Sequence, residues 1–277
     1  MSRRPSRPVR ALASALAVGA LLTTAACSGD GGGSTAGDAV ASPVAEKSKA
    51  VTRTPTASVP ARLTAAGAQA ALITEGDIEG DWNQVKDAAA WGDTLLIGKV
   101  DVAAFLTAKA NAADCQRLLD ALYDDDLLGK PSGASALRGF QQGDSRLLYQ
   151  VAAYNPVRLS ASLAWLKTLP TKCDQFTATD AKGGKRTVQV TTSSVPKQGD
   201  ARQGLNITVQ GTANGEPATL TLDVAAVRVG TDAITVTAGG LDGGEHGSLE
   251  LAVRKGAQRL KDVQAGKTPA PGPGATR

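Results

Sequence analysis

The chain has 277 residues, 42% of them hydrophobic and 3% aromatic, and its 30 lysines and arginines against 26 aspartates and glutamates give a formal net charge of +4. Four of the arginines lie in residues 1–26, which hold no acidic residue, so 26 basic and 26 acidic side chains remain and the rest of the chain has no net charge. Binding to a nucleic-acid backbone needs a clustered basic surface. We therefore expect no nucleic-acid partner.

Residues 1–26 have the pattern of a bacterial export signal. A basic segment ends at Arg10, a charge-free apolar run covers residues 11–22, and small residues lead to Ala26. This order of basic, apolar and small residues is typical of a cleaved signal peptide. The apolar run is too short to cross a bilayer as a helix, which takes about 20 residues.

Cys27 directly follows the predicted cleavage site. Residues 21–27, Leu-Leu-Thr-Thr-Ala-Ala-Cys, resemble a bacterial lipobox, although Thr24 stands where Leu is preferred. The resemblance implies a diacylglycerol on the Cys27 thiol, with fatty-acyl chains such as palmitate, and a membrane partner at the outer face of the cytoplasmic membrane. The alternative is an ordinary signal peptide that leaves Cys27 as a free thiol. Lipidation accounts for the odd cysteine of an exported chain.

The composition divides the rest of the chain into a tether, one domain and a tail. Residues 28–60 are rich in Gly, Ala, Ser, Thr and Pro, a composition that cannot bury enough apolar surface to fold. Residues 267–277 have a similar composition and are expected to be a disordered tail. The folded domain is therefore predicted over residues 61–266, a length that suits one extracytoplasmic domain. Disulfides persist outside the cytoplasm, so we expect Cys115 and Cys173 to pair.

Helices are predicted in four places of this domain. Residues 62–73 are rich in alanine, and residues 111–123 place Cys115 and three leucines on one apolar face. A third helix begins at Asn155-Pro156 and is expected to stop at Pro170. The fourth covers residues 248–264, where apolar side chains recur at helical spacing.

Strands are predicted over residues 136–142 and 146–154, with a turn at Gly143-Asp144. From residue 186 onward apolar and polar residues alternate, and Asn214-Gly215 is a strong hairpin signal. Turns there and at residues 230–232 produce an antiparallel meander. Helices that cover one face of such a sheet define an α+β domain with one disulfide.

The sequence offers few groups for catalysis. His246 is the only histidine, lies among glycines and is expected to be a dispensable, solvated loop residue near a helix start. A hydrolase with a Ser-His-Asp triad would have to use it, and no Gly-x-Ser-x-Gly elbow supplies the nucleophile. We therefore expect no enzyme, no metal and no cofactor, with a hydrolase as a remote alternative.

A ligand site is predicted on the threonine-bearing side of the late strands. Thr221 and Thr235 alternate with Leu222 and Val236, which are expected to be buried while the threonines are exposed as a shallow polar groove. Solvated strands contain threonine by β-propensity alone, and this interpretation stays open. Trp82 and Trp91, around an alanine-rich segment, are a second candidate for ligand contact.

Several ordered segments resemble one known family. These are residues 72–78, the segment around Cys115, the unit from Tyr149 through Trp165 to Cys173, residues 224–230 and the last helix. In this order they resemble the extracellular sensor domain of mycobacterial receptor kinases of the PknH type, here as an actinobacterial lipoprotein without a kinase domain. The resemblance implies an antiparallel sheet with flanking helices, a Cys115–Cys173 bridge and a ligand-binding cleft. A second cysteine pair of many members is missing near Ala238-Gly239.

These observations lead to one expected function and one alternative. We expect a membrane-anchored, extracytoplasmic lipoprotein whose sensor-like domain binds an unknown small molecule or glycan without catalysis. The alternative is a structural or interaction lipoprotein with a protein partner in the cell envelope.

Overall fold

The structure is a computed structural model that describes residues 62–88, 112–123, 126–179, 184–213, 215–241 and 243–270. The chain divides into two units, residues 1–54 and 55–277, and all described residues belong to the second. None of the described helices combines the length and the apolar character that a membrane crossing requires.

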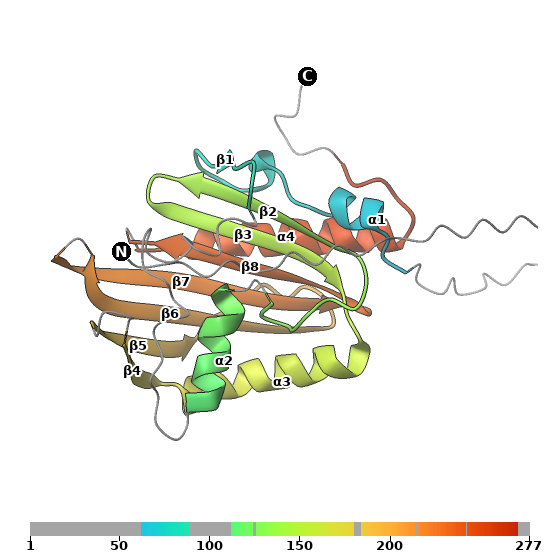
Figure 1. Cartoon of the computed structure of the whole chain (residues 1–277). Helices are drawn as coiled ribbons and strands as arrows, with labels where there is room; N and C mark the ends of the chain where they lie inside the picture. The colour runs from blue at the N-terminus through green and yellow to red at the C-terminus, as the bar shows by residue number, and fades with distance from the viewer. Residues whose placement is uncertain are drawn as a thin grey trace, which may run out of the picture. The chain divides into compact units, whose positions relative to one another are not determined.

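The described strands form one antiparallel sheet, as predicted. Its members are β1 (Asn83–Gln84), β2 (Ser135–Gln142), β3 (Ser145–Ala153), β4 (Gln175–Thr179), β5 (Lys185–Thr192), β6 (Ala201–Ala213), β7 (Glu216–Val229), β8 (Asp232–Gly240) and β9 (Gly243–Gly244). Their order is β1-β2-β3-β8-β7-β6-β5-β4, and β9 pairs with β8 (Figure 1). The predicted β2–β3 hairpin thus joins the late meander through β3 and β8, whereas β1 and β4 were not predicted.

The described helices lie on both faces of this sheet. They are α1 (Ala65–Ala70), the short 3-10 helix η1 (Glu75–Asp77), α2 (Ala112–Tyr123), α3 (Pro156–Lys172) and α4 (His246–Gln264). Helix α3 packs against β5 and β6, and α2 packs on α3, whereas α4 packs against β7 and β8 with α1 beside it (Figure 1). The expectation that helices cover only one face of the sheet is therefore wrong.

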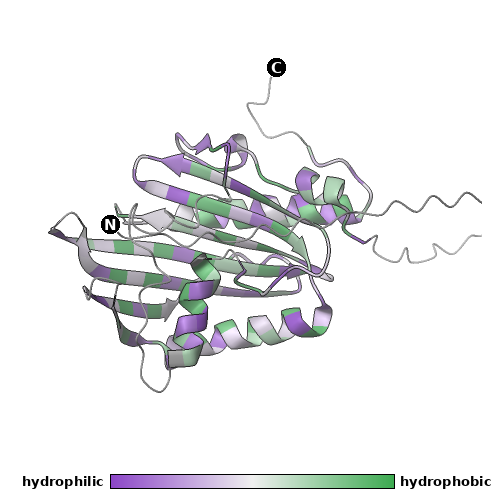
Figure 2. Cartoon of the chain, in the orientation of Figure 1, coloured by the Kyte–Doolittle hydropathy of each residue, from purple (hydrophilic) through white to green (hydrophobic). Residues whose placement is uncertain are grey.

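Each face of the sheet has its own apolar core, and Figure 2 shows how apolar and polar residues are distributed along the strands. Leu205, Ile207 and Leu222 face α2 and α3, while Val227 and Val236 face α1 and α4. Strands β3, β7 and β8 lie between the two cores and are buried over most of their length.

Helices α2 and α3 are joined by the predicted disulfide. Cys115 and Cys173 are bonded, with their Cα atoms 5.6 Å apart and 58 residues apart in the chain. Asn155 caps α3 as expected, since its side-chain oxygen accepts the amide hydrogens of Val157 and Arg158. The helix does not stop at Pro170 but runs to Lys172, because the Cys173 amide donates to the Leu169 carbonyl at 2.7 Å and completes another turn.

The first predicted helix is shorter than expected. Thr64 caps α1 by accepting the amide hydrogen of Gly67 at 3.0 Å, and the helix ends at Ala70 instead of Ile73. The Ile73 carbonyl accepts a hydrogen bond from the Arg138 guanidinium of β2 at 2.8 Å. This segment is therefore bonded to the sheet and does not continue the helix.

Candidate functional site

The structure does not bring the predicted threonine site together. Thr235 is buried, with 9% of its surface exposed, and Thr221 is half-buried, so the prediction that both are solvent-exposed is wrong. In the register Thr235 lies opposite Ala226, whereas Thr221 lies opposite Thr208 and one residue from Leu222. Opposite residues of an antiparallel pair share a face. Ala226 faces α2 and α3, so Thr235 does too, while Thr221 faces away from Leu222, and no groove contains both.

The buried partners of these threonines were predicted correctly, but not their common face. Leu222 and Val236 are each at most 1% exposed. Leu222 belongs to the core beneath α2 and α3, and Val236 belongs to the core beneath α1 and α4. The alternating pattern predicts one buried face, whereas two layers of helices bury alternate residues on both faces of the sheet.

The predicted tryptophan contacts have different outcomes. Trp82 is 3% exposed and belongs to the core beneath α4, where its indole N–H donates to the Ser248 hydroxyl at 3.3 Å. Trp91 and Cys27 lie outside the described residues. Trp82 therefore links the start of the domain to α4 and does not offer an open ring for stacking.

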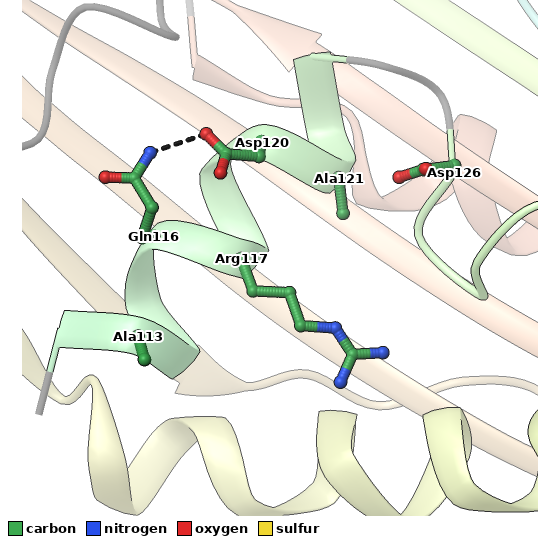
Figure 3. A pocket seen from close by; sticks show the side chains of 6 residues that line it. All are labelled: Ala113, Gln116, Arg117, Asp120, Ala121 and Asp126. Carbon is green, nitrogen blue, oxygen red and sulfur yellow. Dashed lines mark hydrogen bonds between the residues drawn. The ribbon is translucent and has the colours of Figure 1, made fainter.

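A hollow of about 460 Å³ lies against the outer surface of α2. Its described lining consists of Ala113, Gln116, Arg117, Asp120, Ala121 and Asp126. Figure 3 shows Arg117 directed toward α3 and the Gln116 amide donating to the Asp120 carboxylate. One guanidinium, one amide and two carboxylates thus border this space, which we call the α2 pocket.

Arg117, which lines the α2 pocket, is held by Trp165 of α3. The Arg117 guanidinium lies 3.8 Å from the centroid of the Trp165 ring, a cation–π geometry. The indole N–H of Trp165 donates to Asp114 at 2.9 Å, and Asp114 also accepts from Lys172 at 2.6 Å. These contacts and the neighbouring disulfide hold α2 in place on α3.

The Asp114 contacts give the stability of the domain a defined pH dependence. The hydrogen bond from Lys172 is the main cause that lowers the pKa of Asp114, and the Trp165 indole adds to it, although burial opposes both. A carboxylate with a lowered folded pKa stabilises the fold above its ordinary pKa of about 4. That contribution is lost as the pH falls through the lowered value. We expect the melting temperature below pH 4 to fall less steeply in Asp114→Asn than in the wild type; parallel curves would contradict this.

A second hollow, of about 350 Å³, lies at the first turn of α4. Its lining includes His246, Gly247, Ser248 and three glutamates, Glu79, Glu245 and Glu250. His246 was expected in a loop but is the first residue of α4, with 42% of its side chain exposed. We call this space the α4 pocket.

The His246 imidazole is surrounded by hydroxyl and carboxylate groups from three other places in the chain. Its Nε2 lies 3.2 Å from the Ser194 hydroxyl and 3.7 Å from Glu250. Its Nδ1 lies 3.4 Å from the Ser193 hydroxyl and 3.6 Å from Asp223. Sequence reasoning missed Ser193, Ser194 and Asp223, because nothing local to them indicates that β-sheet pairing brings them to one histidine.

Metal binding finds no support where the chain is described. Within those residues no group of three or more His, Cys, Asp and Glu side chains has the geometry to hold a metal ion. Residues 124–126 are three consecutive aspartates, of which only Asp126 lies inside the described ranges.

Comparison with known proteins gives distant structural likeness only. No protein-family model matches the chain, and no curated protein matches it. Among solved structures the chain is similar to the extracellular domain of PknH from Mycobacterium tuberculosis, with 10% sequence identity over 75% of this chain and 100% of that chain and a TM-score of 0.36. A likeness this distant assigns the chain to no family and to no function.

Proposed function

We propose that the chain is an exported lipoprotein, held at the outer face of the cytoplasmic membrane by lipid on Cys27, whose folded domain binds a small molecule or a glycan. The observation that carries the proposal is the order of basic, apolar and small residues that ends directly at Cys27. The sensor-like role that the family resemblance implies belongs to the same proposal.

The disulfide supports export. Cys115 and Cys173 are bonded in the core between α2 and α3. Structural disulfides are rare in the cytoplasm and persist in secreted proteins. The bond is therefore what we expect of a domain that folds outside the cytoplasmic membrane.

The α2 pocket is the place that we propose for the ligand. Arg117 and Gln116 offer N–H donors, and Asp120 and Asp126 offer carboxylate oxygens, so a ligand rich in hydroxyl or amide groups finds both kinds of partner. Glycans and small polar metabolites have this chemistry. The contact with the buried Trp165 ring also positions Arg117 before a ligand binds, and a preformed site loses less entropy on binding.

Native mass spectrometry of the protein purified from its own host tests this site. We expect the wild type to retain an added mass and Arg117→Ala to lose it, since the variant removes the only described cation among the residues that line the pocket. The control is Arg158→Ala, an exposed arginine on α3 away from the pocket lining. Retention of the same mass by Arg117→Ala, with a wild-type melting temperature, would exclude the α2 pocket as the binding site.

A further inference from the structure

The groups around His246 are arranged as in a catalytic triad, with a serine hydroxyl at one imidazole nitrogen and a carboxylate near the other. In a Ser-His-Asp arrangement the serine hydroxyl meets one imidazole nitrogen and the carboxylate meets the other. Here Ser194 Oγ lies 3.2 Å from Nε2, and the Asp223 carboxylate lies 3.6 Å from Nδ1. The second distance is longer than a hydrogen bond, and such contacts often shorten only when substrate binds.

We propose that Ser194, His246 and Asp223 form a catalytic site for ester hydrolysis at the first turn of α4. Ser194 is the nucleophile, His246 is the general base and acid, and Asp223 is a positioning residue that orients the imidazole. The activity goes beyond the proposed ligand binding, uses a different surface of the domain and is independent of it. It also stands against the expectation from the sequence that the chain is not an enzyme.

The residue that orients the imidazole is firmly held. Asp223 is 3% exposed, and its Oδ1 accepts a hydrogen bond from the Asn206 amide at 3.0 Å. A Cβ on Gly244 would lie 2.6 Å from Asp223 Oδ2, so the absence of a side chain there lets β9 pass close to this carboxylate. A buried carboxylate beside Nδ1 favours the tautomer with hydrogen on Nδ1, which leaves Nε2 free to accept a proton from serine.

The nucleophile is fixed through its neighbour. The Ser193 amide donates to the Gly204 carbonyl of β6 at 3.1 Å, and a Cβ on Gly204 would lie 2.6 Å from the Ser193 carbonyl oxygen. This close packing places the exposed Ser194 beside the imidazole. The Ser193 hydroxyl shares Nδ1 with Asp223, and Glu250, the remaining neighbour of the ring, is bound by Arg254 at 2.8 Å.

The reaction that this arrangement supports is a two-step acyl transfer to water. Ser194 Oγ bonds to the ester carbonyl carbon while its proton moves to His246 Nε2; the C–O bond to the alcohol then breaks, and the alcohol leaves with that proton. Solvent water attacks the acyl-serine, gives a proton to Nε2 and forms the carboxylic acid, and Ser194 recovers its proton. The sum is one ester and one water giving one acid and one alcohol.

The α4 pocket limits the substrate class. The first amides of a helix have no partner within the helix, and Glu245 does not cap α4 with its side chain, so N–H groups of the first turn, where Gly247 and Ser248 line the pocket, can donate to a carbonyl oxygen on which negative charge develops. Glu79, Glu245 and Glu250 border the same space against one cation, Arg254, so the described lining has an excess of negative charge that disfavours anionic substrates. The geometry points to short esters that are neutral or positively charged.

Covalent labelling of the purified full chain tests the assignment. A fluorophosphonate reacts with an activated serine by forming an O–P bond and releasing fluoride, and peptide mass spectrometry locates the label. We expect the label on Ser194, and we expect it to fall at least about 100-fold in rate in His246→Ala, the usual loss when a general base is removed. Thr192→Ala, which removes an exposed hydroxyl two residues away, should label like the wild type.

Hydrolysis of p-nitrophenyl acetate gives the second measurement. Ser194→Ala should lower kcat/KM by about 100-fold or more with an unchanged melting temperature, because Ser194 is exposed. Asp223→Asn should lower kcat, leave KM unchanged and alter the pH profile, which a merely structural role would not do. Absence of label on Ser194, or labelling that His246→Ala leaves undiminished, overturns the proposal.

Discussion

Replacing Cys115 and Cys173 together by alanine is expected to lower the free energy of unfolding by about 2–5 kcal/mol, the usual cost of removing a native disulfide. The bond closes a loop across 58 residues and restricts the unfolded chain. Both cysteines are also buried in the core between α2 and α3, so alanine leaves a small cavity as well. Urea unfolding, followed by circular dichroism, measures the change.

Reduction of the wild type supplies the control for this prediction. A reducing agent should bring the wild-type midpoint close to that of the double variant and leave the variant itself unchanged. If the variant unfolds at the wild-type urea concentration, the disulfide contributes nothing to stability and the prediction is wrong.

Asp77→Ala is expected to lower the free energy of unfolding by about 3 kcal/mol, because it removes a buried carboxylate that binds Thr74 and the half-buried Arg259 guanidinium. Asp77 Oδ2 accepts from the Thr74 amide at 2.8 Å and the Thr74 hydroxyl at 3.0 Å, and Arg259 Nη1 of α4 lies 3.4 Å away. The side chains of Arg259 and Asp77 are 13% and 6% exposed. One carboxylate therefore joins η1 to α4.

Glu79→Ala is the matched control for Asp77, since it removes an exposed carboxylate two residues away. Surface substitutions of this kind change stability by about 0.5 kcal/mol or less. Equal losses in both variants would mean that net charge, not the buried contact with Arg259, determines the effect. The double variant Asp77→Ala/Arg259→Leu should recover part of the loss, since it removes the half-buried guanidinium together with the carboxylate that it binds.

Local patterns predicted most elements of the fold. Gly143-Asp144 and Asn214-Gly215 marked two hairpins, and apolar residues at helical spacing marked α2, α3 and α4. The pattern did not show that helices cover both faces of the sheet. Apolar residues and threonines can alternate along a strand with one solvated face, and they can also alternate along a strand between two cores. Thr235 was misplaced for this reason.

The candidate sites were less predictable than the fold. Arg117 and Trp165 are far apart in sequence and meet because the disulfide and Asp114 hold α2 on α3. The glycine neighbours of His246 and the missing Gly-x-Ser-x-Gly elbow predict a solvated loop residue, although partners of the imidazole come from the loop after β5 and from β7. Such contacts depend on how strands that are distant in the sequence pair, and local patterns in a single sequence do not indicate which residues of those strands lie opposite each other.

Membrane fractionation of the wild type and Cys27→Ser, with mass spectrometry of the N-terminal peptide, tests the central claim most directly. We predict that the wild type is found in the membrane fraction, that its N-terminal peptide begins at Cys27 and that this peptide carries a diacylglycerol. Ser28→Ala should behave like the wild type, whereas Cys27→Ser should appear in the medium. A wild-type peptide that begins at Cys27 without lipid, or a Cys27→Ser protein that stays in the membrane with residues 1–26 uncut, would contradict the proposed lipoprotein.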